Sequence, residues 1–109
     1  MLTREDFEKV EMRVWTIIEA KEFPEARNPS LQLTIDFWDF GIKKSSAQIT
    51  KLYSKESVVW KQIVAVTNFP PKQIATFMSE CLLLGVIGDN KEITLLTTDK
   101  ATKNWYRIG

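Results

Sequence analysis

Hydrophobic and polar residues alternate most clearly in residues 30–37, where Leu31, Leu33 and Ile35 are separated by polar side chains. A period of two is typical of a β-strand with one buried face. Other apolar or β-branched runs predict strands at residues 12–20, 40–49, 62–67, 82–86 and 93–96. The chain is therefore expected to fold mainly as short β-strands.

The connections between these runs carry the usual signals of loops and turns. Two prolines make residues 23–29 a rigid loop, and a tight turn is expected around Trp38 and Asp39. Residues 54–59 are predicted to form one short helical turn, capped by Ser54. Five or more short strands with a brief helix after the third predict an all-β barrel, which leaves few exposed strand edges. The pattern fits an OB barrel and an SH3-like barrel equally well.

Length and composition narrow the classes of function. A chain of 109 residues with 44% hydrophobic content is expected to form one domain, residues 1–109. It contains no histidine and one cysteine, Cys81, which excludes histidine catalysis, histidine metal sites and a disulfide framework. We expect no enzyme activity, no metal and no cofactor. Neither a signal peptide nor a transmembrane segment is visible in the sequence, and the expected location is the cytoplasm.

Charge is distributed unevenly along a chain whose net charge is only +1. Residues 1–40 contain five basic and nine acidic side chains, whereas residues 41–72 contain six lysines and one acid, Glu56. Such a basic block attracts phosphate groups through counterion release. The alternative is an ordinary solvated surface that happens to be rich in lysine.

Several segments are more specific than this pattern. They are Glu-Phe-Pro-Glu-Ala-Arg at residues 22–27, Gly-Ile-Lys-Lys-Ser-Ser-Ala-Gln-Ile-Thr at 41–50, Asn-Phe-Pro-Pro-Lys-Gln-Ile at 68–74, and Met-Ser-Glu at 78–80 followed by Leu-Leu-Leu-Gly at 82–85. In this order, the segments resemble the tRNA-binding-domain family over residues 7–109. That family includes domains appended to methionyl-tRNA synthetases, EMAP II-like cytokine precursors and CsaA-type secretion chaperones, and the last of these are the most similar to this chain.

The resemblance implies a five-stranded OB fold, a homodimer formed through terminal extensions, and binding of tRNA by its shape and backbone. The alternative function that it implies is binding of unfolded or export-bound polypeptides, as in CsaA-type chaperones. In either case the chain itself would not be an enzyme.

Lysines supply point charges for phosphate, and hydroxyl or amide groups can bond to phosphate or sugar oxygens. The predicted tRNA-binding residues are Lys43, Lys44, Ser45, Ser46, Gln48, Lys51, Asn68, Lys72, Met78, Ser79 and Glu80. Because adjacent residues of a strand point to opposite faces, only part of the serine and lysine run can reach a ligand. A carboxylate repels phosphate, so Glu80 is expected to orient a lysine or accept a bond from a base or ribose. The predicted peptide contacts are Phe23, Phe69, Phe77 and Met78.

The four tryptophans are unusual in their positions. Trp15, Trp38, Trp60 and Trp105 stand where the resembling family has glycine. Three of them also fall at predicted turns, where glycine is favoured because it tolerates positive φ. We hypothesise that UGA codons, read as glycine in the source organism, have been translated here as tryptophan. The alternative is that these are genuine aromatics that stack on a ligand or fill a dimer interface.

Both ends of the chain carry apolar residues beyond the predicted barrel: Leu2, Phe7, Val10, Tyr106 and Ile108. A second copy of the chain would cover them and would place two lysine-rich faces side by side. The alternative is that residues 1–10 and 97–109 fold back over their own barrel.

Overall fold

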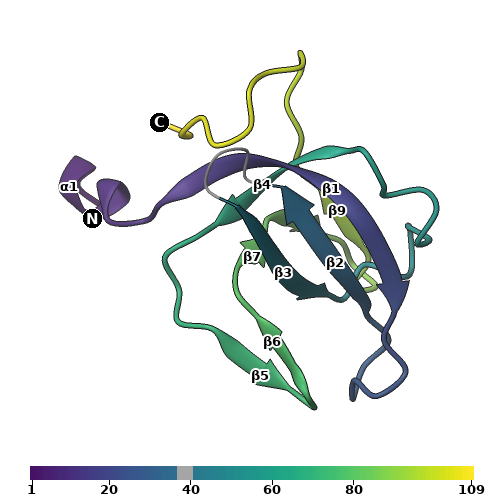
Figure 1. Ribbon diagram of the computed structural model, residues 1–109. Coiled ribbons are helices and arrows are strands. Elements are labelled where there is room, and N and C mark those ends of the chain that lie inside the picture. Colours follow the sequence, from purple (N-terminus) through teal and green to yellow (C-terminus); the bar gives the residue numbers. More distant parts are fainter. Residues whose placement is uncertain (37–40) are drawn as a thin grey trace.

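The computed structural model describes residues 1–36 and 41–109. Its elements in chain order are α1 (Arg4–Glu8), β1 (Met12–Glu22), β2 (Leu31–Asp36), β3 (Ile42–Ala47), β4 (Gln62–Val66), β5 (Lys72–Ile74), β6 (Phe77–Ser79), β7 (Leu82–Leu83), β8 (Gly85–Ile87) and β9 (Ile93–Leu95). Five strands form one antiparallel sheet in the order β3-β2-β1-β4-β7, which curls into a nearly closed barrel (Figure 1). The predicted all-β, OB-like fold is confirmed.

Strand β1 is long enough to serve both halves of the barrel. Its first half, Met12 to Thr16, pairs with β4, and its second half, Thr16 to Glu22, pairs with β2. The register with β2 shifts between Ile17 and Glu19. A bulge of this kind bends a strand and increases its twist, and here it lets one strand belong to both sides of the barrel.

The alternating pattern of residues 31–36 is confirmed. Leu31, Leu33 and Ile35 are at most 2% exposed, while the polar residues between them are half-buried. They join one core with other buried side chains, chiefly Trp15, Ile17, Ile49, Val58, Ile63, Ala65 and Leu95. The predicted start of the third strand at Phe40 and the turn at Trp38 and Asp39 lie outside the described residues.

Residues 54–59 form hydrogen-bonded turns and not the predicted helical turn. Ser54 and Ser57 each accept a hydrogen bond from the other's backbone N–H, at 2.9 and 3.1 Å. The Ser57 N–H also donates to the Ser54 carbonyl at 3.1 Å, which closes a single turn. Val58 is fully buried beside them and belongs to the core, so the segment packs against the barrel by one side chain.

A helix that the sequence analysis missed, α1, lies at the N-terminus. Thr3 caps it with a complete capping box, in which its side chain accepts from the backbone of Asp6 and Asp6 bonds back to Thr3. None of its residues is buried. In the described part of the chain, no helix is long and apolar enough to cross a membrane.

Two hairpins form separate two-stranded sheets beside the five-stranded sheet. Strands β5 and β6 pair from Lys72 with Ser79 to Ile74 with Phe77, and this hairpin extends from one end of the barrel (Figure 1). The predicted strand at residues 82–86 is divided into β7 and β8, and β8 pairs with β9 around the expected turn at Gly88. Gly85 permits this pairing because a Cβ there would lie 2.9 Å from the carbonyl oxygen of Thr94.

The C-terminal segment lies against the barrel of its own chain. The N–H of Trp105 donates to the carbonyl of Val14 at 2.6 Å, and the N–H of Val14 donates to Tyr106 at 3.0 Å. The side chain of Gln62 holds the preceding loop, because its amide bonds the backbone of Thr102 in both directions. The tail therefore covers the edge of β1 that β2 leaves unpaired.

The three described tryptophans occupy different environments. Trp15 is fully buried within β1. Trp60 and Trp105 have left-handed backbones, with φ of 73° and 77°. Turn geometry that favours glycine is therefore present at two of the positions expected from the sequence, and Trp38 lies outside the described residues.

Candidate nucleic-acid interface

Strand β3 separates the Lys-Lys-Ser-Ser-Ala-Gln run into two sets. Ser45 and Ala47 are buried, whereas Lys44 and Gln48 are exposed and Ser46 is half-buried between them. This is the alternation that the pleat of a strand imposes. The outward row of Lys44, Ser46 and Gln48 is the part of the run that a ligand can reach.

The buried Ser45 side chain and the backbone of Lys44 and Ser46 close the barrel by hydrogen bonds. The Ser45 hydroxyl donates to the Cys81 carbonyl at 2.9 Å, and the backbone N–H of Ser46 donates to Ser79 Oγ at 3.0 Å. Lys44 and Glu80 bond twice, through the Lys44 N–H to Glu80 Oε1 at 3.0 Å and the Glu80 N–H to the Lys44 carbonyl at 2.8 Å. We call these contacts between residues 44–46 and 79–81 the seam.

Glu80 also faces a lysine side chain. Its Oε2 lies 3.9 Å from Lys43 Nζ, with the two side chains 34% and 44% exposed. One carboxylate oxygen thus holds the backbone of β3, and the other faces a cation at the end of the seam. Lys43 therefore differs from Lys44, for which no ion pair is recorded among the described residues.

Cys81 lies at the inner end of the seam and is 7% exposed. Burial raises the pKa of its thiol from 9.0 to about 12, although the hydrogen bond with Ser45 acts in the opposite direction. A thiol that remains protonated is a poor nucleophile and a poor metal ligand. Cys81 therefore acts as a small core side chain, as the sequence suggested.

Beside the seam, a groove of about 1080 Å³ runs between the loop before β2, the end of β3 and the β5–β6 hairpin. Its polar lining includes Arg27, Ser46, Gln48, Lys72 and Ser79. Four of these five were predicted as tRNA-binding residues, and they come from segments up to 33 positions apart in the sequence, as between Ser46 and Ser79. Arg27 was not predicted, although its segment had been singled out, because the position of the loop depends on the folded barrel.

The same groove has an apolar component. Phe69, Leu82 and Ile87 line it and are at least half exposed, at 54%, 50% and 74%. Ile74 and Leu83 line it with partly buried side chains. The groove thus offers hydrogen-bonding groups, two cations and solvent-exposed apolar surface to one ligand.

Four predicted site residues lie outside this groove in addition to those of the seam. The Asn68 amide bonds the N-terminal segment, donating to the Lys9 carbonyl at 2.6 Å and accepting from the Glu11 N–H at 3.0 Å. Lys51 donates to the Asn90 carbonyl. Met78 is 46% exposed on β6, and Lys43 lies beside Glu80.

Two of the four predicted peptide contacts face each other. The rings of Phe23 and Phe77 lie 5.4 Å apart, and Phe23 is only 4% exposed. This pair attaches the β5–β6 hairpin to the loop that precedes β2. Phe69 is the one member of the predicted set that lines the groove.

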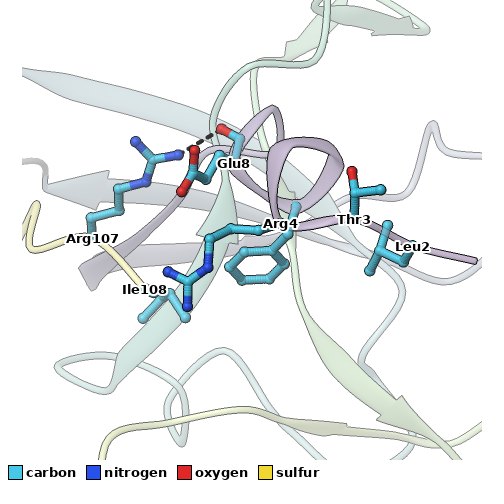
Figure 2. Close-up of a pocket in the computed structure, with 8 residues that line it drawn as sticks. Leu2, Thr3, Arg4, Glu8, Arg107 and Ile108 are labelled. Atoms are coloured by element: carbon cyan, nitrogen blue, oxygen red, sulfur yellow. Dashed lines mark hydrogen bonds between the residues drawn. The ribbon is translucent and has the colours of Figure 1, made fainter.

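A second pocket, of about 590 Å³, lies between α1 and the C-terminal tail. Figure 2 shows Arg4, Arg107 and Ile108 around it, with Leu2 at the far end of α1. The Arg107 guanidinium donates to the Glu8 carbonyl at 2.7 Å and so joins the two ends of the chain. Three of the five terminal apolar residues that were expected to need cover line this pocket: Leu2, Phe7 and Ile108.

The chain is similar to known proteins both in sequence and in fold. Residues 12–105 match the family model of the tRNA-binding domain, tRNA_bind. The structure of the chaperone CsaA from Bacillus anthracis superposes with a TM-score of 0.94 at 45% identity, covering 100% of this chain and 99% of that chain. The CsaA chaperone protein from Picrophilus torridus superposes with a TM-score of 0.93 at 46% identity, covering both chains completely.

A curated relative links the fold to a larger protein. A methionine–tRNA ligase from Leptospira biflexa is 34% identical over 99 residues, which cover 91% of this chain and 14% of the ligase. The chain therefore spans about one seventh of the length of that relative. The family match over residues 12–105 and the two CsaA structures lead to one conclusion: the chain belongs to the tRNA-binding-domain family.

Proposed function

We propose that the protein is a non-enzymatic tRNA-binding module of the cytoplasm, which recognises the shape and backbone of tRNA through the groove beside the seam. The observation that carries this proposal is the convergence of Arg27, Lys72, Gln48 and Ser46 on one groove. Two cations supply charge for phosphates, and the amide and hydroxyl groups can bond phosphate or ribose oxygens. Lys44 extends the same surface along β3.

The mode of binding follows from these groups. Folded RNA is recognised mainly by shape, phosphates and 2′-hydroxyls, because side chains cannot read its deep major groove. The exposed Phe69 ring gives a platform on which an unpaired base can stack. Some of the predicted residues are proposed to support the site and not to form its main contacts, because their side chains have partners within the chain: Lys43, Ser45, Lys51, Asn68 and Glu80.

A gel-shift series with tRNA over increasing salt tests this proposal. Each phosphate neutralised contributes about −0.7 to −0.9 to the slope of log affinity against log salt. We expect a clear negative slope. In Lys72→Ala it should become shallower by about the contribution of one phosphate contact. Lys55→Ala is the matched control, because Lys55 is an exposed lysine of the same basic block and does not line the groove. A flat salt dependence for the unmodified protein would rule out a phosphate-dominated interface.

The apolar side of the groove supports a second function, binding of unfolded polypeptide. Phe69, Leu82 and Ile87 are exposed together, and exposed apolar patches commonly mark interaction sites. Two similar structures carry the name of a chaperone, CsaA. Suppression of aggregation of a denatured test protein, insensitive to moderate salt and reduced by Phe69→Ser, would favour this function. Loss of tRNA binding with unchanged suppression in Lys72→Ala would show that the two activities are separable.

A homodimer is part of the proposal, with a second copy seated on the pocket between α1 and the tail. Leu2 and Tyr106 are 72% and 55% exposed, and no side chain of α1 is buried. Helices without a buried face gain stability from packing against a partner. Sedimentation of Leu2→Ser/Phe7→Ser should give a monomer. A variant that still sediments as a dimer would exclude α1 from the interface.

A further inference from the structure

Two tryptophans in this chain have a backbone that suits glycine. Trp60 and Trp105 have φ of 73° and 77°, in the left-handed region. Only a few per cent of non-glycine residues adopt positive φ, and for bulky residues it is a genuine outlier. Here two of the three tryptophans in the described part of the chain do so.

Hydrogen bonds fix the conformation at position 60. The Trp60 N–H donates to the Ile17 carbonyl at 2.7 Å, and the next residue, Lys61, accepts from the Ile17 N–H at 3.1 Å. These bonds continue the pairing of β1 with β4 into the preceding turn. The left-handed backbone is thus a requirement of the barrel, and another φ at this position would break the ladder.

The side chain of Trp60 buries little surface that could offset this strain. It is 72% exposed, so the indole remains largely in water. Trp60 therefore has one of the largest side chains in the sequence on a strained backbone, and it does not bury its ring. A glycine would satisfy the same hydrogen bonds without the strain, since it has no Cβ.

Position 105 repeats the geometry with one difference. The Trp105 N–H bonds the Val14 carbonyl at 2.6 Å, and its ring lies 4.7 Å from the Arg13 guanidinium. The backbone is again fixed by pairing with β1, but this ring gains a cation–π contact and partial burial. Trp15 forms the contrast, because it lies within a regular strand and is fully buried.

The other non-glycine residues with positive φ are different in kind. Ala75 and Lys91 lie at the tips of the β5–β6 and β8–β9 hairpins, where one residue is commonly left-handed. Their side chains are small or flexible. The large strained residues are both tryptophan, which suggests a common cause in the coding of the chain.

We propose that residues 60 and 105 are glycine in the protein as its source organism makes it, and that both are encoded by UGA. UGA is a stop codon in the standard code, but some genetic codes read it as tryptophan and others read it as glycine. Translation under a tryptophan code would place indoles where the organism inserts glycine. This inference does not depend on what the protein binds.

The direct test is to read the gene and to measure the tryptic peptides of the protein isolated from its source. UGA at codons 60 and 105, with peptide masses that match glycine, is the expected result. UGG codons, or peptide masses that match tryptophan, would overturn the proposal. Codons 15 and 38 then show how far the same reassignment extends.

A second test uses the recombinant protein. Trp60→Gly should raise the melting temperature by about 4 °C or more, because it removes the strain without loss of packing. Trp60→Ala is the control, since it removes the ring but retains a Cβ, and it should gain much less. Trp105→Gly should gain less than Trp60→Gly, because it also loses the contact with Arg13. Equal gains for glycine and alanine at position 60 would show that φ strain is not the cause.

Discussion

Strand β3 contributes to two adjacent regions with opposite chemistry, the seam and the groove. In the seam, Ser45 and Cys81 are buried, and Ser45 and the backbone of Ser46 bond to groups of the same chain. In the groove, Lys72, Gln48 and Arg27 are exposed and remain available to a ligand. A polar motif in a small barrel can therefore have two roles, and the direction in which each side chain points from the strand decides between them.

The two roles predict separable consequences of mutation. Changes in the seam should reduce stability and affect binding only through the fold, because buried polar groups are costly to leave unpaired. Changes at the groove rim should reduce binding and leave stability nearly unchanged, as is usual for surface substitutions. Four substitutions test this division, starting with the largest expected effect.

Ser45→Ala is expected to have the largest effect on stability. It removes a hydroxyl that is 1% exposed and leaves the Cys81 carbonyl without its donor. Such an unsatisfied buried group costs about 1–3 kcal/mol of unfolding free energy. Urea denaturation of Ser45→Ala beside Ser46→Ala measures it, because Ser46 joins the seam through its backbone N–H, which alanine retains. Equal losses in the two variants would contradict the inward and outward assignment.

The buried Cys81 thiol should make the unfolding free energy of the protein depend on pH. Its pKa is about 12 in the folded protein and 9.0 for the reference thiol. Above pH 9 the unfolded chain loses a proton that the folded chain keeps, so the unfolding free energy falls as pH rises from 9 toward 12. At pH 10 the loss is about 1.4 kcal/mol. Denaturation at pH 8 and pH 10 should show this loss in the unmodified protein and a smaller one in Cys81→Ala. Equal losses would show that other groups cause the alkaline destabilisation.

The groove is tested by a substitution of Arg27. Arg27→Ala is expected to weaken tRNA binding about fivefold, or about 1 kcal/mol, and to leave the melting temperature within one or two degrees. The reason is that Arg27 lines the groove and is exposed, so its charge is available to a phosphate. Filter binding at low salt measures the affinity, with Lys55→Ala as a control of equal charge outside the groove. A loss of stability with unchanged affinity would move Arg27 from the binding surface to the fold.

The sequence predicted the strands of the barrel because their patterns are local, but it did not predict the short strands β5 and β6. Leu31, Leu33 and Ile35 predict a buried face within six residues, and the structure confirms it. The turn at residues 54–59 was predicted as helical because its capping serine is equally typical of a turn. The reciprocal bonds of Ser54 and Ser57 do not distinguish the two, since Thr3 and Asp6 form the same pattern at the start of α1.

The candidate site was less predictable, since its geometry depends on contacts between distant residues. Ser45 and Ser46 look alike in sequence, yet Ser45 is buried and Ser46 lines the groove. The hydrogen bond that holds the Ser45 side chain inside the barrel is to Cys81, 36 positions away in the sequence. Arg27 reaches the groove because the loop before β2 is attached through the Phe23–Phe77 pair. Neither relation leaves a local signal, although Pro24 and Pro29 do mark the loop as rigid.

Glu80 lies on the boundary between the seam and the groove, and it gives the smallest expected effect. Glu80→Gln keeps an oxygen that can accept from the Lys44 N–H but removes the charge beside Lys43. Because this ion pair is partly exposed and its atoms are 3.9 Å apart, stability should change by about 0.5 kcal/mol or less. The freed Lys43 should strengthen tRNA binding about twofold and steepen the salt slope. Glu56→Gln removes the same charge from the basic block without touching the seam, and it should strengthen binding less. If Glu80→Gln instead weakens binding at unchanged stability, Glu80 contacts the RNA itself and belongs to the groove.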